Sequence, residues 1–243
     1  MGGLDRAAAI LGAFDATHRE LTLAALVARC GMPRSTTHRT ADRMIKLGWL
    51  DKPKDRYRIG NRLFEISSLA PVKHELREAV LPFLQDLHHA TKATVQLGVL
   101  DGTDILVVER ITGHRQMPML SQAGGIIPAF CSALGRAILA HADPETVEAV
   151  LSAELPRRTP RTLTSPVAIK RELASIPTRG WAVDREEGVI GVSCVGAPVF
   201  GPLGRVVAAV SATGPNDRIR AERIGPAVRL TAAAASRAYS TRR

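Results

Sequence analysis

The stretch that most constrains this chain is GMPRSTTHRTADRMIKL, which occupies residues 31–47. On a helix, at about 100° per residue, its side chains separate into two faces. One face carries Thr37, Ala41, Met44 and Ile45, and the other carries Ser35, Arg39, Asp42, Arg43 and Lys46. We therefore predict an amphipathic helix that buries the first face and presents a mostly cationic or hydroxylated face to a partner.

The residues before this helix predict a second, shorter one. Thr22 is a suitable N-cap for a helix over 23–30, and Gly31 supplies the positive φ that ends such a helix. Pro33 suits the start of the helix that follows. Two helices joined by this tight turn are a helix-turn-helix signature.

The flanking segments complete a winged helix-turn-helix domain over residues 1–70. Residues 4–14 repeat apolar side chains at helical spacing, which predicts a first helix. After Gly48, residues 49–51 and 56–59 have the pattern of two short strands, which a turn joins into a hairpin. The exposed tip of this hairpin carries Lys52, Lys54, Arg56 and Arg58.

The distribution of charge favours a polyanionic partner for this first region. The chain has a formal net charge of +10 and a pI near 10.4. Residues 1–73 hold 13 cationic side chains against 7 acidic ones, so a net +6 lies in the first third of the chain. Basic charge concentrated on a helix-turn-helix is typical of nucleic-acid binding. We therefore predict double-stranded operator DNA as a partner.

In such a motif the first turns of the second helix enter the major groove. There arginine suits the guanine edge, while hydroxyl groups suit several bases or the neighbouring phosphates. This predicts DNA contacts from Arg34, Ser35, Thr36, His38 and Arg39. Phosphate contacts that set the register are predicted for Arg43, Lys46, Lys52, Lys54 and Arg56. A non-specific architectural DNA-binding protein stays open as an alternative function.

Other classes of protein find little support. Three widely spaced cysteines favour neither a disulfide framework nor a zinc site, and they fit a reducing cytoplasm. The first ten residues indicate no signal peptide, and the Pro and Gly residues of 116–135 argue against a membrane-spanning helix. An enzyme with Cys194 as nucleophile and His114 or His141 as base is a weaker alternative, because neither histidine forms a recognisable signature with it. We expect no cofactor, no metal and no catalysis.

The second region predicts an α+β domain over residues 82–243, joined to the first domain by a linker helix at 71–81. Pro82 lies inside a helical pattern over 73–91, so we predict a break or kink near residue 81. The later pattern is typical of a largely antiparallel sheet. Strands are predicted at 94–99, 105–110, 181–184, 192–199 and 205–213, and helices at 133–141, 144–152, 166–178 and 220–239.

Small residues and a glycine gather at a predicted helix start in PAFCSALGRA, residues 128–137. The free N–H groups of a helix start can bind a carboxylate, whereas small residues also let a helix pack closely on a sheet. Spacing alone leaves these two interpretations open. Taken singly, Asp184 and Cys194 are expected to have structural roles. Asp184 would cap a turn, and Cys194 would be a small buried apolar residue.

Seven stretches, taken in chain order, form a specific pattern: LDRAAAIL, LTLAALVARCGMPRSTTHR, LGWL, YRIGNRLFEI, IPAFCSALGRAILA, RGWAVDREEGVIGVSCVGAPV and GRVVAAVSATGP. Through them the chain resembles the IclR family of bacterial transcriptional regulators over nearly its whole length. The resemblance implies a winged helix-turn-helix, a linker helix and a C-terminal GAF-like effector-binding domain, assembled as dimers or tetramers on operator DNA. It also implies a repressor or activator of a catabolic or other small-molecule pathway.

The same resemblance implies a pocket for a small organic acid. Its residues would be the backbone N–H groups of Ala133 and Leu134 with Asp184, Cys194, Ser211 and Thr213, and an apolar part lined by Met117, Met119 and Phe130. Two positions depart from the family's pattern. Arg136 replaces the usual Lys and is expected to remain a surface cation, and Ile190 replaces a common Pro, which leaves the shape of that loop open.

Overall fold

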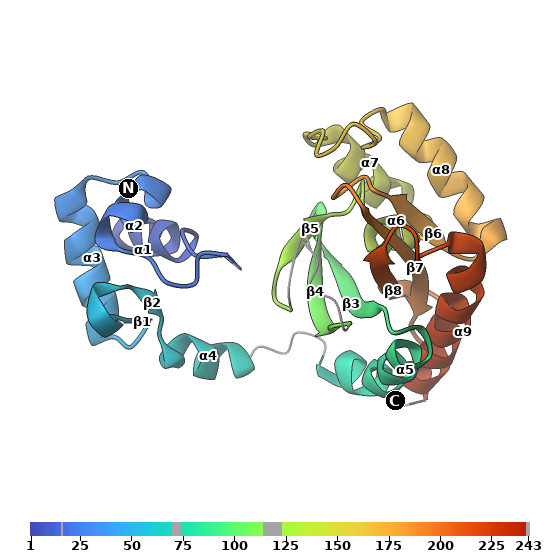
Figure 1. The fold of residues 1–243 in the computed structure, drawn as a ribbon, viewed down its shortest axis with the longest axis horizontal. Helices are drawn as coiled ribbons and strands as arrows, with labels where there is room; N and C mark the ends of the chain where they lie inside the picture. The colour runs from blue at the N-terminus through green and yellow to red at the C-terminus, as the bar shows by residue number, and fades with distance from the viewer. Residues whose placement is uncertain (16, 70–73, 114–122, 242–243) are drawn as a thin grey trace. The chain divides into compact units, whose positions relative to one another are not determined.

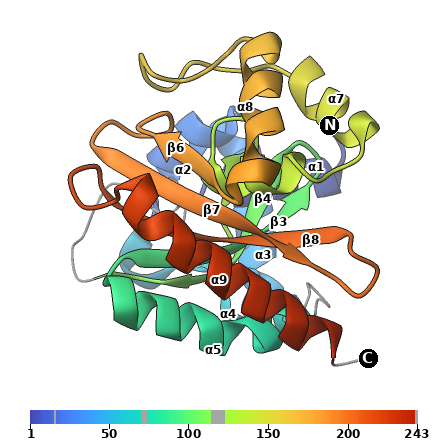
Figure 2. The same cartoon turned by 90° about the vertical axis from the view of Figure 1, so that its right-hand side faces the viewer.

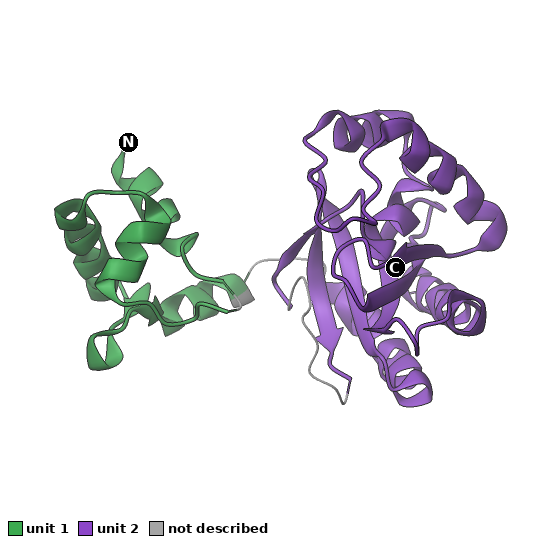
Figure 3. Ribbon diagram, turned by 45° about the horizontal axis from the view of Figure 1, so that its top comes forward, with its two compact units in different colours: residues 1–72 green, residues 73–243 purple. Residues whose placement is uncertain are grey.

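The computed structural model describes residues 1–15, 17–69, 74–113 and 123–241. By their contacts the residues form two compact units, Met1–Val72 and Lys73–Arg243 (Figure 3). The first unit has one hydrophobic core, and the second has two, one on each face of its sheet. The predicted pocket residues Met117 and Met119 and the predicted linker residues 71–73 lie outside the described residues.

The first unit contains the predicted winged helix-turn-helix. Its elements are α1 (Gly3–Leu11), α2 (Leu23–Cys30), α3 (Arg34–Lys46), β1 (Leu50–Asp51), η1 (Pro53–Asp55), β2 (Arg58–Ile59) and α4 (Asn61–Ser68) (Figure 1). Thr22 caps α2, because its hydroxyl accepts a hydrogen bond from the backbone N–H of Ala25 at 3.2 Å. Gly31 ends α2 with a φ of 68°, as its position in the sequence predicts.

The second unit is built on a six-stranded sheet in the order β5-β4-β3-β8-β7-β6, and every neighbouring pair is antiparallel. The strands are β3 (Thr94–Asp101), β4 (Asp104–Ile111), β5 (Ile126–Pro128), β6 (Ala182–Arg185), β7 (Val192–Phe200) and β8 (Val206–Pro215). The predicted α+β class and antiparallel sheet are confirmed. Strand β5 is absent from the sequence prediction, because three residues are too few to show an alternating pattern.

Helices cover both faces of this sheet (Figure 2). Two long helices, α5 (His74–Thr91) and α9 (Ala221–Ser240), pack together on one face. The other face is covered by α6 (Ala133–Leu139), which shares a core with α7 (Pro144–Ser152) and α8 (Pro166–Arg179). Because side chains alternate along a strand, each inner strand sends every second residue to each of these two cores.

Helix α5 corrects the prediction of a break near residue 81. It runs through Pro82 from His74 to Thr91 without interruption. Leu76 and Val80 before the proline, and Leu84 after it, are fully buried in one core with the sheet, whereas Pro82 itself is exposed. Burial on both sides of the proline holds the helix together despite the missing backbone donor. The helical residues before Pro82 therefore pack within the second unit.

Candidate functional site

Helix α3 presents the two faces that the sequence predicts. Thr37, Ala41 and Met44 are buried, and the last two belong to the core of the first unit. The Thr37 hydroxyl donates a hydrogen bond to the Pro33 carbonyl at 3.1 Å, so this polar side chain is satisfied inside the core. The helix is therefore anchored by one face while the opposite face lies in solvent.

All ten predicted DNA-contacting residues lie in this unit, on α3 or on the hairpin. Thr36 is half-buried, and the exposed nine are Arg34, Ser35, His38, Arg39, Arg43, Lys46, Lys52, Lys54 and Arg56. Within α3, which is described in full, the single acid Asp42 lies 3.1 Å from the Nδ1 of His38. The exposed face of α3 is thus mostly positive.

Some cations of the hairpin already have partners. The Lys52 ammonium lies 3.1 Å from the Asp55 carboxylate and 5.3 Å from the centre of the Tyr57 ring. The hydrogen bond to Asp55 raises the pKa of Lys52. Arg58 lies 3.4 Å from the Asp51 carboxylate. Exposed cations elsewhere on the hairpin, Lys54 and Arg56, are therefore better placed to contact a phosphate.

In the second unit, the sheet brings four predicted pocket residues together on the face that α6 covers. Asp184 pairs with Cys194, and Cys194 pairs with Thr213, so one row crosses β6, β7 and β8. Ser211 lies two residues before Thr213 and therefore points to the same face. The Thr213 hydroxyl donates a hydrogen bond to the Cys194 Sγ at 2.9 Å. We call Asp184, Cys194, Ser211 and Thr213 the polar patch.

The start of α6 packs directly on β7 beside the polar patch. A Cβ added at Gly196 would lie 2.6 Å from the Ala133 carbonyl oxygen and 3.1 Å from the Leu134 nitrogen. Ser132 caps the helix by accepting a hydrogen bond from the backbone N–H of Gly135 at 3.1 Å. These contacts support the close-packing interpretation of the small residues, and the anion interpretation stays a prediction. Phe130, also predicted for the pocket, is buried in the core that α6 forms with α7 and α8.

Asp184 is 8% exposed, and its carboxyl group accepts a hydrogen bond from the backbone N–H of Glu187 at 2.7 Å. This bond caps the turn after β6, which is the structural role considered for Asp184. Burial raises the pKa of Asp184 to about 7, although the hydrogen bond from Glu187 acts in the opposite direction. Near neutral pH the carboxyl group can therefore donate a hydrogen bond or accept one.

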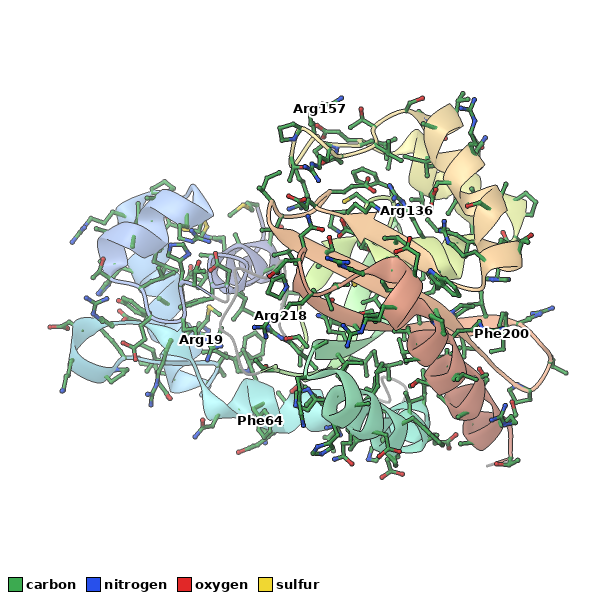
Figure 4. All side chains as sticks on the ribbon, turned by 45° about the vertical axis from the view of Figure 1, so that its right-hand side comes forward. Arg19, Phe64, Arg136, Arg157, Phe200 and Arg218 are labelled. Atoms are coloured by element: carbon green, nitrogen blue, oxygen red, sulfur yellow. The ribbon has the colours of Figure 1, made fainter. Side chains whose placement is uncertain are left out.

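Arg136 is buried, so the expectation that it is a surface cation is wrong (Figure 4). Its guanidinium donates two hydrogen bonds to the Glu187 carboxylate, at 2.5 and 2.6 Å, and its Nε donates to the Phe130 carbonyl at 2.8 Å. Glu187 also accepts a hydrogen bond from the backbone N–H of Leu163 at 3.0 Å. This ion pair joins α6 to the turn that Asp184 caps.

Two further polar residues on this face of the sheet lie outside the sequence prediction. Gln96 of β3 pairs with Ser211 of β8 on one side and with Arg110 of β4 on the other. Directly paired residues of antiparallel strands point to the same face, so all three face the α6 side. The signal was present in the sequence, because Thr94 and Gln96 are alternate polar residues in an otherwise apolar strand.

The environment of Cys194 does not suit catalysis. Burial raises the pKa of this thiol to about 12, whereas a nucleophilic cysteine needs a lowered pKa. In the parts of the chain that the structure describes, no group of three or more His, Cys, Asp and Glu side chains could hold a metal ion. Within the same parts, each helix is too short or too polar to cross a membrane.

Two family models match the chain, one for each unit. The model of the IclR helix-turn-helix domain matches residues 3–53. The model of the bacterial transcriptional regulator IclR C-terminal domain matches residues 69–240. The second match alone spans more than half of the chain.

Curated relatives are named as regulators of transcription. The HTH-type transcriptional regulator BhcR of Paracoccus denitrificans is 32% identical over 91% of this chain and 80% of its own length. The transcriptional repressor IclR of Escherichia coli is 32% identical over 84% of this chain and 76% of its own. These names agree with the expectation that the chain is not an enzyme.

Solved structures share the fold over almost the entire chain. An IclR homolog from Microbacterium hydrocarbonoxydans, complexed with 4-hydroxybenzoate, superposes with a TM-score of 0.86 at 29% identity. That match covers 99% of this chain and 100% of the other. The IclR of Thermotoga maritima gives a TM-score of 0.78 at 29% identity and covers 98% of each chain.

Proposed function

The chain belongs to the IclR family of bacterial transcriptional regulators, and on this premise we propose that it is a ligand-responsive regulator. It binds operator DNA through Met1–Val72 and a small organic acid through Lys73–Arg243. Acting in the cytoplasm, it represses or activates the genes of a small-molecule pathway, such as a catabolic one.

The observation that carries the DNA-binding proposal is the anchored and exposed helix α3. Its buried face fixes the helix in the core, so the exposed side chains of its first turns occupy defined positions. Arg34 and Arg39 suit guanine edges in the major groove, and Arg43 and Lys46 suit phosphates. An architectural DNA-binding protein needs only a basic surface. A recognition helix that is anchored in the core, as α3 is, therefore favours a sequence-specific regulator.

The polar patch supports the effector part of the proposal. It places polar side chains of Asp184, Ser211 and Thr213 in a largely apolar interior, beside the start of α6 and Phe130. Few polar groups in an apolar setting are typical of sites for small ligands. The neighbour that holds 4-hydroxybenzoate makes an aromatic acid a reasonable first ligand. Met119 remains part of the proposed pocket by resemblance alone.

We propose that the chain forms a homodimer or homotetramer, because helix-turn-helix proteins bind paired half-sites of DNA. Helix-turn-helix dimers place two recognition helices in successive major grooves, with half-sites about 34–36 Å apart or at multiples of that distance. An effector that binds one arrangement of the subunits more tightly shifts the protein toward that arrangement. The spacing of the recognition helices, and with it operator affinity, then depends on the effector.

The test of this function compares base-reading and phosphate-contacting residues. Arg39→Ala should lower affinity for operator fragments, selected from genomic DNA by the protein itself, by about tenfold, because a bidentate base contact contributes about 1–3 kcal/mol. Random DNA of equal length should lose much less affinity. Both affinities are measured by fluorescence anisotropy at one fixed salt concentration.

Arg43→Ala is the matched control on the same helix. As a phosphate contact it should weaken binding to operator and to random DNA by similar factors. If Arg39→Ala weakened binding to operator and to random DNA by equal factors, Arg39 would not contact bases specifically. A wild-type protein without preference for any genomic fragment would favour the architectural alternative.

A further inference from the structure

We propose that the second unit has a further ligand site, a small cavity at the ends of β3 and β8 that binds a phosphate group. Lys92 and Arg218 hold the phosphate oxygens in this site. The site is separate from the proposed effector pocket and goes beyond the function proposed above.

The cavity has a volume of about 100 Å³ and lies where four segments of the chain meet. These are the end of α5, the start of β3, Gly113 after β4, and the stretch from the end of β8 into the first turn of α9. One water molecule needs about 10–15 Å³ of such space. The cavity is therefore large enough for a group of several heavy atoms.

The charge around the cavity is positive. Its charged lining residues are Lys92 and Arg218 (labelled in Figure 4), both exposed, and none of the described residues that line it is acidic. Asp217, which is next to Arg218 in the sequence, does not line the cavity. Among the described residues, neither cation forms an ion pair with a carboxylate. Two uncompensated cations at one recess create a positive potential that attracts an anion.

Lys92 occupies a backbone position that glycine usually takes. Its φ is 57°, and its N–H donates a hydrogen bond to the His88 carbonyl at 2.7 Å, which ends α5. The residues at the corresponding ends of α2 and α8 are Gly31 and Gly180. A residue with a Cβ is strained in this conformation, so the backbone gains nothing from lysine here. An ammonium group at the cavity gives the side chain a role that glycine lacks.

The lining favours phosphate over a carboxylate. A phosphate group carries a charge of about −1.5 to −2 near pH 7, which matches two cations better than a single negative charge does. The Arg218 guanidinium can donate two parallel hydrogen bonds to phosphate oxygens, and the Lys92 ammonium acts as a point charge. Ile219, which is buried, and Ile224, which is half-buried, form an apolar wall. Such a wall excludes water and strengthens the attraction.

The cavity is distinct from the polar patch on the α6 face of the sheet. Thr213 belongs to both, but its hydroxyl group already donates a hydrogen bond to the Cys194 Sγ at 2.9 Å. In the part of the chain that the structure describes, no residue of α6, β6 or β7 lines the cavity. A phosphate bound by Lys92 and Arg218 instead joins the end of α5 to the start of α9, the two helices that pack on the opposite face.

The experiment is equilibrium dialysis of the full-length protein against radiolabelled inorganic phosphate. It is run near pH 7.5 in about 0.15 M sodium chloride, which screens diffuse attraction to basic surfaces. Wild-type protein should bind one phosphate per chain at a saturable site. Arg218→Gln should lower the affinity at least about tenfold, because it removes charge-assisted hydrogen bonds.

Two further variants separate the site from the fold and from surface charge. Lys92→Gly should also lower the affinity at least about tenfold, yet it should not lower the unfolding temperature, because glycine adopts this backbone without strain. Arg220→Gln removes an exposed cation that lies two residues from Arg218 and does not line the cavity, so it should change the affinity less than about twofold. Thermal unfolding without phosphate checks each variant, and Lys92→Gly carries the test if Arg218→Gln does not fold.

Competition against the labelled phosphate identifies the ligand class. At equal ionic strength, unlabelled phosphate should compete at a concentration at least about tenfold lower than acetate does, because acetate carries a single charge. Methyl phosphate separates the two sources of a phosphate group. If it competes as phosphate does, the site accepts phosphate esters, and if it does not, the site takes the free ion; both results support a phosphate site.

The remaining outcomes overturn the inference. They are a wild-type protein that binds no phosphate, and Arg218→Gln and Lys92→Gly variants that bind it as tightly as wild type. A loss in Arg220→Gln as large as that in Arg218→Gln would assign the binding to a diffuse basic surface and not to the cavity. Acetate that competes as well as phosphate would exclude a phosphate site. None of these results bears on operator or effector binding, so the proposed function would stand.

Discussion

Arg136 and Glu187 form the most deeply buried ion pair among the described residues, with side chains 1% and 8% exposed. Glu187→Gln removes the negative charge that pairs with the buried Arg136 guanidinium. Loss of one partner of a buried pair costs about 3–5 kcal/mol, so the free energy of unfolding of the second unit should fall by about this amount. Urea denaturation followed by circular dichroism measures it.

An exposed pair in the same unit provides the control. Lys170 and Glu148 are 52% and 62% exposed, and their charged atoms are 2.7 Å apart. Glu148→Gln should change the free energy of unfolding by less than about 1 kcal/mol. If Glu187→Gln lowered the free energy of unfolding by no more than Glu148→Gln does, Arg136 would not be desolvated as the structure indicates.

Asp184 makes the stability of the second unit depend on pH. Its pKa is raised from 3.8 to about 7, so between these values the folded state keeps a proton that the unfolded state has lost. The contribution of Asp184 to the free energy of unfolding therefore falls as the pH rises through this window, by about 1.4 kcal/mol per pH unit and roughly 4 kcal/mol in all. Above pH 7 the contribution is constant.

Asp184→Asn tests this dependence, since asparagine can still accept the hydrogen bond from Glu187 but cannot ionise. The variant should gain stability relative to wild type as the pH rises from 4 to 7. The measurement is urea denaturation of both proteins at several pH values. A difference between them that does not change with pH would show that Asp184 titrates as an ordinary, solvated carboxyl group.

The site residues differ in how far the sequence could predict them. The exposed and buried faces of α3 follow from helical periodicity, because each face is decided within one helix. Arg136 could not be placed in this way, because its partner Glu187 lies 51 residues away and is brought near only by folding. Gln96 carries a local signal, since it alternates with Thr94, but only the strand register shows that Gln96 and Arg110 share a face of the sheet with Ser211.

At the scale of elements, local patterns predict the long helices and strands, while short or interrupted elements depend on the rest of the fold. The strands over 192–199 and 205–213 and the last helix appear within two residues of their predicted ends. The predicted break near residue 81 fails because core contacts on both sides of Pro82 outweigh one missing hydrogen bond. Strand β5 exists because β4 offers it an edge to pair with.

The contact between β7 and α6 permits a prediction of its own. A methyl group added by Gly196→Ala would meet the backbone of Ala133 at 2.6 to 2.8 Å, so the start of α6 must shift. Overpacking of this kind costs about 1–3 kcal/mol. We expect a lower unfolding temperature and weaker binding of 4-hydroxybenzoate, measured by calorimetry. Gly3→Ala adds the same methyl group where nothing lies within 4 Å and should change neither quantity.

At the scale of the whole molecule, the distribution of charge and the division into two compact units indicate two separate tasks. A net +6 in the first 73 residues predicts which unit meets DNA, because charge is readable without knowledge of the fold. The identity of the effector is not readable in this way. It depends on the shape and polarity of the proposed pocket, whose residues come from β6, β7, β8 and α6 and so from no single stretch of sequence.

The proposed regulator binds DNA and effector in different units, so their communication is a coupling free energy and must be reciprocal. If saturating 4-hydroxybenzoate changes operator affinity by some factor, saturating operator must change ligand affinity by the same factor. Couplings of this kind are typically about 5- to 150-fold. Anisotropy gives the first factor and calorimetry the second, both at several protein concentrations. Factors that differ and vary with protein concentration would show that assembly is part of the coupling. If the ligand binds but both factors equal one, neither affinity depends on the other partner, and the protein is not a ligand-responsive regulator.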